Sequence, residues 1–235
     1  MRYVWRMSQI SPRERLSRLV ELAAQTDHAA RRALVNGLAD LLLDWPASYP
    51  AAMREPFEAL LEKSLRNVEP ALRAELAERF VERAETPLHL LNLLVFDAAP
   101  QTKSAILMRN ALAHETRVAA PTALTQDAAL LSAVRAHPSD TLADTLASHF
   151  RVVPEIATQI LADETGWMLA ALCKGTGLRR AAFSALAVLA HPTATPDESY
   201  RRLAAYDAVP QEGAAALLAF WRDAAPAAAK TAEAA

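Results

Sequence analysis

Proline residues that follow helix-capping side chains divide this chain into many short helical segments. The segment Ser11–Glu14 reads Ser-Pro-Arg-Glu, and the segment Thr195–Glu198 reads Thr-Pro-Asp-Glu. In both, a hydroxyl side chain takes the N-cap, proline the first helical position and glutamate the third, which is the order of a capping box. Further prolines stand where a helix can begin, at Pro70, Pro87, Pro154 and Pro210. Prolines placed in this way predict a series of helices, because proline inside a helix or a central strand would break it.

Between these prolines the apolar residues recur with the period of an α-helix. Leu16, Leu19, Val20 and Ala23, for example, stand at positions i, i+3, i+4 and i+7. No stretch shows the sustained alternation of apolar and polar residues that indicates a strand. The pattern predicts about 12 or 13 helices. They span residues 12–25, 28–44, 51–66, 70–84, 87–96, 102–113, 126–136, 140–149, 154–163, 166–174, 178–190, 196–206 and 210–223.

The composition supports an all-α fold. Of the 235 residues, 53 are Ala and 34 are Leu, both strong helix formers, whereas only 5 are Gly and 6% are aromatic. So few glycines and aromatics argue against a β-sandwich or β-barrel. Short links between the predicted helices make successive helices antiparallel. We therefore expect an irregular HEAT-like solenoid or a bundle of antiparallel helix pairs.

A weak internal repeat favours stacked pairs over a single irregular bundle. Residues Leu72–Asp97 contain a helix, a turn, a proline-started helix and a closing acidic residue, and Leu142–Asp163 have the same order. A weaker copy covers Phe183–Asp207. Each pair would bury its apolar face against the next. We expect one helical domain over residues 1–225 and a disordered Ala-rich tail over 226–235, which lacks an apolar face.

The first copy of this pattern also resembles a known family. The matching residues are Leu72-Arg73, Leu76-Ala77, Thr86-Pro87, Leu90-Leu91, Leu94 and Asp97. Together with the stretch His137–Ala190, they resemble the bacterial family catalogued as domain of unknown function 2336. The resemblance implies irregular HEAT-like helix pairs over about half of the chain, and no catalytic residues, because the family has none defined. The segment Asp97–Glu115 departs from the family pattern, since it carries Lys103, Met108-Arg109-Asn110 and His114.

Two arginine pairs are the candidate binding residues. The net charge is only -2, which argues against a dedicated nucleic-acid binder. Arg179-Arg180 and Arg201-Arg202 lie on neighbouring predicted helices, so they would grip an acidic peptide or a phosphate if they met on one edge. Trp221 lies near enough in sequence to join them. The alternatives are scattered, solvated arginines and a Trp221 packed in the core.

Other reactive side chains have simpler structural explanations. The six histidines form no metal-binding motif, and His191 before Pro192 is typical of a helix end. Cys173 lies on an apolar helix, which predicts a core position. The run Lys174–Gly177 lacks the phosphate-loop pattern, so we expect Gly175 to end a helix in a left-handed cap. The sequence therefore predicts no metal and no cofactor.

The number of cysteines and the length of the apolar runs allow a prediction of the cellular compartment and of membrane insertion. A single cysteine cannot form an internal disulfide, which suits a reducing compartment. The first residues lack the apolar core of a signal peptide. The longest apolar runs, Gly166–Cys173 and Ala181–Ala190, fall short of the roughly 18–20 residues that span a bilayer. We expect a cytoplasmic protein that does not enter a membrane.

The architecture predicts a non-catalytic protein-interaction or regulatory adaptor module, not an enzyme. Two alternatives remain. A helical enzyme would have a pocket that gathers Glu164, His149 and Asp144. A phosphate- or nucleic-acid-binding module would bring its arginines onto one face, namely Arg2, Arg6, Arg31, Arg32, Arg179, Arg180, Arg201 and Arg202.

Overall fold

The all-α prediction is confirmed. A computed structural model describes residues 12–25, 27–113, 128, 130–132, 134 and 142–223. These residues contain thirteen helices, one of them a single 3-10 turn, and no strand. The predicted helix over 126–136 lies mostly outside the described residues, and the predicted tail over 226–235 lies wholly outside them.

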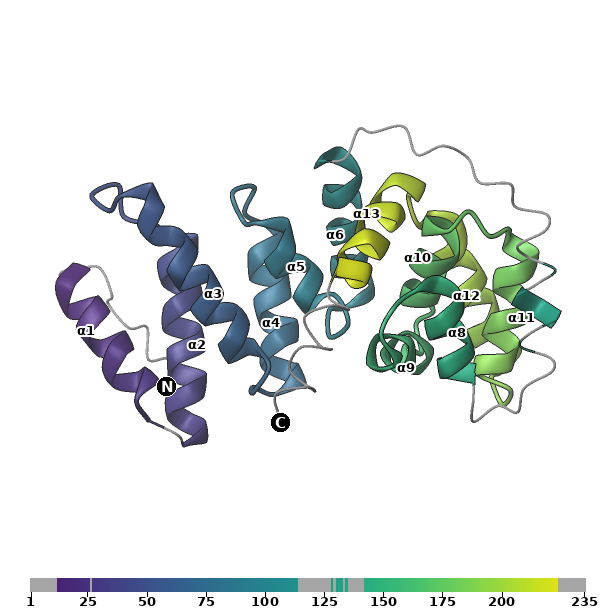
Figure 1. Cartoon of the computed structure of the whole chain (residues 1–235), viewed down its shortest axis with the longest axis horizontal. Coiled ribbons are helices and arrows are strands. Elements are labelled where there is room, and N and C mark those ends of the chain that lie inside the picture. The colour runs from purple at the N-terminus through teal and green to yellow at the C-terminus, as the bar shows by residue number, and fades with distance from the viewer. Residues whose placement is uncertain are drawn as a thin grey trace. The chain divides into compact units, whose positions relative to one another are not determined.

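The chain divides into two compact units, Met1–Asp97 and Ala98–Ala235. The prediction of a single domain stays a prediction, because compactness of each part does not decide whether they fold together. The helices of the first unit are α1 (Pro12–Ala23), α2 (His28–Leu43), η2 (Ala51–Met53), α3 (Arg54–Leu65), α4 (Pro70–Val81) and α5 (Leu88–Leu94). α1 packs on α2, α2 on α3 and α4 on α5, and the pair α2/α3 also contacts the pair α4/α5 (Figure 1). This is the arrangement of stacked helix pairs.

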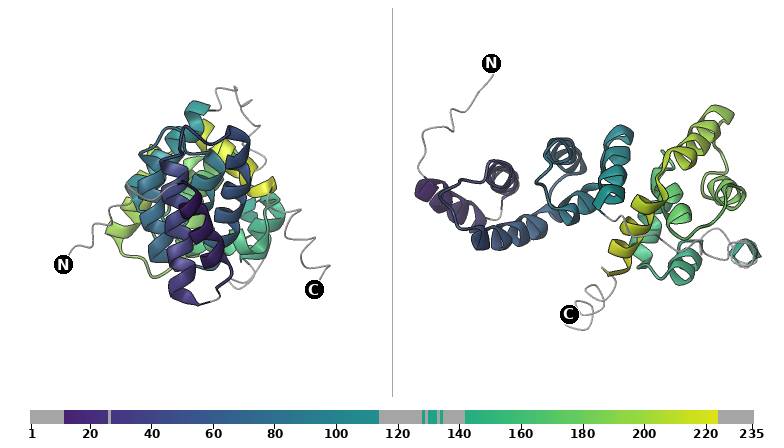
Figure 2. Two further views of the ribbon diagram at one scale, coloured as in Figure 1. Left: turned by 90° about the vertical axis from the view of Figure 1, so that its left-hand side faces the viewer. Right: turned by 90° about the horizontal axis from the view of Figure 1, so that it is seen from above.

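The second unit is closer to a bundle, because its last helix does not simply continue the stack. Its helices are α6 (Pro100–Ala113), α8 (Leu142–Phe150), α9 (Pro154–Ala162), α10 (Trp167–Gly175), α11 (Arg180–Ala190), α12 (Pro196–Ala208) and α13 (Gln211–Asp223). α13 packs against both α10 and α6, which lie far from it in sequence (Figures 1 and 2). The pairs α8/α9, α10/α11 and α11/α12 still follow chain order.

Helix α10 forms the centre of the second unit, and two glycines allow its neighbours to come close. Residues Met168–Cys173 are all buried, which confirms the core position of Cys173. A Cβ atom on Gly213 would lie 2.0 Å from the Leu107 carbonyl oxygen, and one on Gly175 would lie 2.6 Å from the Ala214 oxygen. Neither glycine can therefore be replaced without separating α13 from α6 or from α10.

The predicted left-handed cap at Gly175 is wrong by two residues. Gly177, with φ of 76°, takes the left-handed conformation, whereas Gly175 is still helical. The Leu178 N–H donates to the Cys173 oxygen at 2.8 Å and the Gly177 N–H donates to the Lys174 oxygen at 3.0 Å, which is the Schellman pattern. Sequence alone could not separate the two glycines, because the close approach of α13 is a tertiary contact.

The proline signals place the helix starts well. Thr195 and Glu198 form the predicted capping box, and Pro70 and Pro154 occupy the first turns of α4 and α9. Pro87 lies one position earlier than expected, at the N-cap of α5. The predicted cap at Ser11 lies outside the described residues.

The acidic residue that closes each copy of the weak repeat forms an ion pair with a basic side chain. The Asp97 pair is partly exposed, the Asp163 pair is buried, and the Asp207 pair is exposed. These acidic residues therefore fasten helices together within each unit. The pairs are Arg73 Nε–Asp97 Oδ2 at 2.7 Å, Lys103 Nζ–Asp163 Oδ1 at 2.8 Å and Arg180 Nε–Asp207 Oδ1 at 3.0 Å.

Candidate functional site

A pocket of about 600 Å³ opens in the second unit where the residues before α10 face the start of α12. Its walls come from the α9–α10 link, the α11–α12 link, the first two turns of α12 and the first residue of α6. Charged and polar side chains dominate this lining. The lining residues are Pro100, Glu164, Thr165, Trp167, His191, Thr193, Ala194, Glu198, Arg201 and Arg202.

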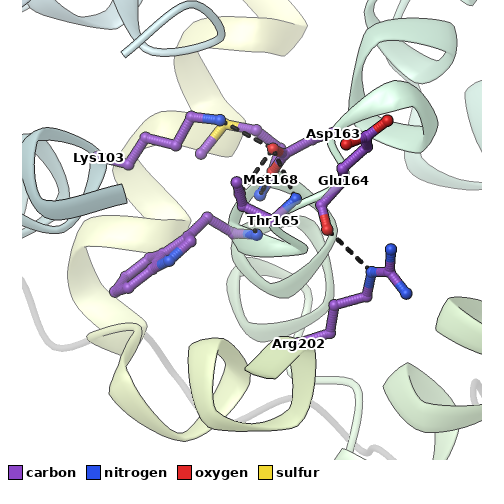
Figure 3. A network of polar contacts seen from close by, with 7 residues as sticks. Lys103, Asp163, Glu164, Thr165, Met168 and Arg202 are labelled. Atoms are coloured by element: carbon purple, nitrogen blue, oxygen red, sulfur yellow. Dashed lines mark hydrogen bonds and ion pairs between the residues drawn. The ribbon is translucent and has the colours of Figure 1, made fainter. Parts of the chain in front are cut away.

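A buried ion pair fixes the α9–α10 link at the pocket wall. Lys103 Nζ on α6 lies 2.8 Å from Asp163 Oδ1, and the two side chains are only 4% and 5% exposed. The Thr165 hydroxyl donates to the same carboxylate at 2.6 Å and the Met168 N–H at 2.9 Å, as Figure 3 shows. Burial opposes ionisation of Asp163, but the Lys103 charge and these hydrogen bonds outweigh it, so its pKa is lowered. Asp163 therefore serves as a charged anchor for the start of α10.

Gly166, the N-cap of α10, makes room for Arg202 on α12. Its φ of 77° is left-handed, and a Cβ atom there would lie 2.8 Å from Arg202 Cγ. A residue with a side chain would be strained by this backbone and would also push against the Arg202 stem. Glycine at this position thus lets the stem of Arg202 lie against the link.

Arg202 is buried, yet most of its hydrogen-bonding capacity is not used by the fold. The residue is 6% exposed, and its Nε–H donates to the Glu164 carbonyl oxygen at 2.9 Å (Figure 3). Within the described part of the chain, Nη1 and Nη2 have no hydrogen-bond partner. The guanidinium is therefore held by one edge, while its other donors remain for a group in the pocket.

The capping box of α12 positions the acidic wall of the pocket. Glu198 Oε2 accepts a hydrogen bond from the Thr195 N–H at 2.7 Å, and the Glu198 N–H donates to the Thr195 hydroxyl at 3.3 Å. The hydrogen bonds with Thr195 lower the Glu198 pKa, and the charges of Arg202 and Arg201 lower it further. Glu198 is consequently a fixed carboxylate, one helical turn before Arg202.

His191 ends α11 and lines the same pocket. The Ala194 N–H donates to the His191 carbonyl oxygen at 3.1 Å and closes the turn after the helix. Burial lowers the His191 pKa, and the Arg202 charge lowers it further. The carboxylates of Glu164, Asp163 and Glu198 act in the opposite direction but do not cancel the shift. The imidazole is therefore neutral at neutral pH and supplies one donor and one acceptor.

This arrangement suits the binding of an anionic group better than metal binding or acid catalysis. Arg202 and Arg201 supply cationic donors, and the half-buried Trp167 supplies an aromatic wall. Among the residues that the structure describes, no group of three His, Cys, Asp or Glu side chains could hold a metal ion. A carboxyl group that acts as an acid near neutral pH needs a raised pKa, whereas that of Glu198 is lowered.

The structure separates the five predicted partner-binding residues. Arg201 and Arg202 line the pocket, but Arg179 and Arg180 do not, and Arg180 instead hydrogen-bonds Asp207 at the surface. Trp221 is 1% exposed in the core of the second unit, which matches the core alternative. Its burial leaves no indole surface for a partner. Partner binding by the four arginines stays a prediction.

The alternative functions are also only partly supported by side-chain placement. Glu164 lines the pocket, but His149 and Asp144 on α8 do not. Burial lowers the His149 pKa, and its ring contacts Phe150 edge-on, with centroids 5.0 Å apart. Arg31 and Arg32 lie on α2 in the first unit, whereas Arg2 and Arg6 fall outside the described residues.

Sequence reasoning missed Trp167, His191 and Glu198 as pocket residues. His191 was explained by a helix end and Glu198 by a capping box, and Trp167 lies in the apolar run Gly166–Cys173. The available signal was their position, because all three lie within a turn of a helix end. Link residues carry binding groups more often than helix centres do.

Comparisons with known proteins identify a family and nothing more specific. The profile of a bacterial family described as "Uncharacterised protein conserved in bacteria (DUF2336)" matches residues 52–219, about 70% of the chain. The match includes every residue that lines the pocket. No curated protein and no solved structure matches. Within the described residues, the helices are too short or too polar for any of them to cross a bilayer.

Proposed function

Because the chain belongs to this uncharacterised bacterial family, we propose a function from its pocket: a non-catalytic module that binds a protein partner. The pocket around Arg202 is the recognition site for one group of that partner. The observation that carries the proposal is the guanidinium of Arg202. The Glu164 carbonyl oxygen holds its Nε–H, and its Nη donors, which the described part of the fold does not use, are open to the pocket.

The fixed position of Arg202 supports this function. None of the buried, unpartnered side-chain nitrogens among the described residues belongs to Arg202, so its Nη groups are open to the pocket and a bound group can reach them. Here the Asp163 network, Gly166 and the Glu164 carbonyl all hold the link that receives Arg202. A rigidly held charged side chain with unused N–H donors is suited to recognise a polar group of a partner.

The chemistry of the remaining side chains supports binding without catalysis. The capping box ties Glu198 in place and lowers its pKa, and burial with the Arg202 charge makes His191 a weaker base than usual. General acid–base catalysis works best when the pKa lies near the working pH. The buried Cys173 thiol fits a reducing compartment, so we also propose that the module acts in the cytoplasm.

Quantitative affinity capture from a bacterial lysate tests the function. The bait is the full chain, compared with Arg202→Gln and with the matched control Arg66→Gln. Arg66 is the C-cap residue of α3; its side chain is 71% exposed, and its Nη2 lies 3.6 Å from Glu62 Oε1. We expect a protein that the wild type and Arg66→Gln enrich equally and that Arg202→Gln loses at least tenfold. Thermal melting of each bait verifies that it is folded.

Two results would refute the proposal. One is an enriched set that does not change in Arg202→Gln while that variant is folded. The other is the absence of any stoichiometric partner for the wild type after chemical cross-linking, which preserves weak complexes. If Arg202→Gln does not fold, Arg202→Lys keeps the stem and the charge but loses the planar fork, and the same loss of capture is expected.

A further inference from the structure

The shape of the open donor edge on Arg202 limits what it can bind. Nε is occupied by the Glu164 carbonyl, so the two Nη atoms form the free side of a planar fork. Two N–H groups of such a fork lie parallel and match two oxygens on one atom. Carboxylates and phosphates have this geometry, whereas an amide offers only one oxygen.

The charges around the fork favour a single negative charge. Arg201 and Arg202 line the same pocket as Glu164 and Glu198, so the formal charges of these four side chains balance before a ligand enters. A phosphate group brings nearly two negative charges at neutral pH and would meet both carboxylates. A carboxylate brings one charge and suffers less repulsion. The pocket is thus better matched to a carboxylate than to a phosphate or a nucleic-acid backbone.

The apolar and neutral parts of the wall fit the rest of an acidic side chain. Trp167 is half-buried and can cover methylene groups, and the neutral His191 adds one hydrogen-bond donor or acceptor. The volume of about 600 Å³ lies inside the roughly 300–1,000 Å³ of ordinary ligand pockets. That space holds a glutamate side chain together with neighbouring backbone.

From these contacts we infer that the pocket binds the carboxylate of an acidic side chain in the partner polypeptide, with both Nη groups of Arg202 donating to its two oxygens. This inference rests on the proposed function and adds the chemistry of the recognised group. Arg201 stands at the rim as a second cation, and Trp167 covers the methylene groups of the bound side chain.

A pair of peptides that differ in one group tests the inference. The probes are acetyl-Ala-Ala-Glu-Ala-Ala-amide and the same peptide with Gln in place of Glu, titrated into the full ¹⁵N-labelled chain. Sodium acetate and sodium phosphate at matched ionic strength form two further arms. The readouts are the Arg202 Nε–H and the Trp167 indole N–H signals, assigned from the spectra of Arg202→Lys and Trp167→Phe.

We expect the Glu peptide to shift both signals saturably and to bind at least tenfold more tightly than the Gln peptide. A tenfold difference corresponds to about 1.4 kcal/mol, the lower range for a hydrogen bond to a charged group. Arg202→Gln should lose this discrimination, and Arg66→Gln should keep it. Acetate should shift the same signals more weakly, because it lacks the peptide contacts.

Several outcomes would overturn the inference. Equal affinity for the two peptides, or no saturable shift with either, would show that the pocket does not recognise a carboxylate. Saturation by acetate but not by the Glu peptide indicates a small acid instead of a polypeptide, and tighter binding of phosphate indicates a phosphate site. Glu-specific binding without a captured protein would refute the proposed function and leave this inference standing. A captured partner that depends on Arg202, together with equal binding of the Glu and Gln peptides, would support the proposed function and refute this inference.

Discussion

The buried pair between Lys103 and Asp163 allows the sharpest stability prediction. Lys103→Met removes the cation and leaves the Asp163 carboxylate 5% exposed, with hydrogen bonds from Thr165 and Met168 but no counter-charge. Loss of one partner from a buried ion pair costs about 3–5 kcal/mol. A domain of ordinary stability has about 5–15 kcal/mol in total. We therefore expect Lys103→Met to remove a large share of the folding free energy.

The double variant separates charge from packing. Lys103→Met with Asp163→Asn removes both charges and keeps one oxygen that can accept from Thr165 or from Met168. The cost should fall to about 1–3 kcal/mol, the value of the hydrogen bonds that asparagine cannot reproduce. The two single costs should therefore not add, which is the signature of direct coupling.

Urea unfolding followed by far-UV circular dichroism measures these values. Arg66→Met, which breaks an exposed pair at the C-terminal end of α3, is the matched control and should cost less than about 1 kcal/mol. A cost for Lys103→Met no larger than that control would contradict the burial argument. Additive costs for the two single changes would contradict the pairing.

The same pair gives a pH dependence of definite sign. Because the folded Asp163 pKa lies below its unfolded value, the pair's full stabilisation is present above the unfolded pKa. It is lost as the pH falls from the unfolded towards the folded pKa. Wild-type stability should therefore fall more steeply in acid than that of the double variant, in urea titrations between about pH 5 and pH 2. Parallel curves would show that Asp163 is not the group involved.

Three further variants or conditions test the pocket and its supports. Gly166→Ala should lower the folding free energy by at least about 1–2 kcal/mol through backbone strain and should shift the Arg202 Nε–H signal. An unchanged signal would argue against the close approach of residue 166 and Arg202. Thr195→Ala should cost about 1 kcal/mol through loss of the cap, seen as a drop of a few degrees in Tm, whereas an unchanged Tm would mean that the capping box adds nothing. A bound carboxylate should raise the His191 pKa, so the Glu peptide should bind more tightly as the pH falls through that pKa. ¹H NMR titration of the imidazole measures both effects. A His191 pKa that falls when the Glu peptide binds would contradict this placement of the carboxylate.

Local signals in the sequence predicted the helices well because helix ends are local structures. The capping box at Thr195 needs only four consecutive residues, and Pro70 needs only the fixed φ of its own ring. The buried position of Cys173 followed from the apolar run around it. In these places, residues close in the chain determine the conformation.

The interior of the second unit depends on contacts between distant residues, which local patterns do not specify. Lys103 and Asp163 are separated by 60 positions. A partial signal existed, since Lys103 and Asn110 share a helical face with Ile106 and Leu107, all of them buried. That face indicates a buried cation but does not name its partner.

The pocket was hard to predict for a related reason. The sequence grouped Arg201 and Arg202 with Arg179 and Arg180 because both pairs look alike. What distinguishes Arg202 is its approach to Gly166 and to the Glu164 carbonyl, on a link more than thirty residues earlier. Only the packing of α12 beside α10 brings them together.

The position of the bound carboxylate tests whether Arg202 and Trp167 form the recognition site. Isotope-filtered NOE spectra of the labelled chain with the unlabelled Glu peptide report which protons lie within about 5 Å of the glutamate methylenes. We expect NOEs from these methylenes to the Trp167 ring and to the Arg202 side chain. NOEs only to residues outside the pocket lining, with none to Trp167 or Arg202, would show that the carboxylate does not bind in this pocket.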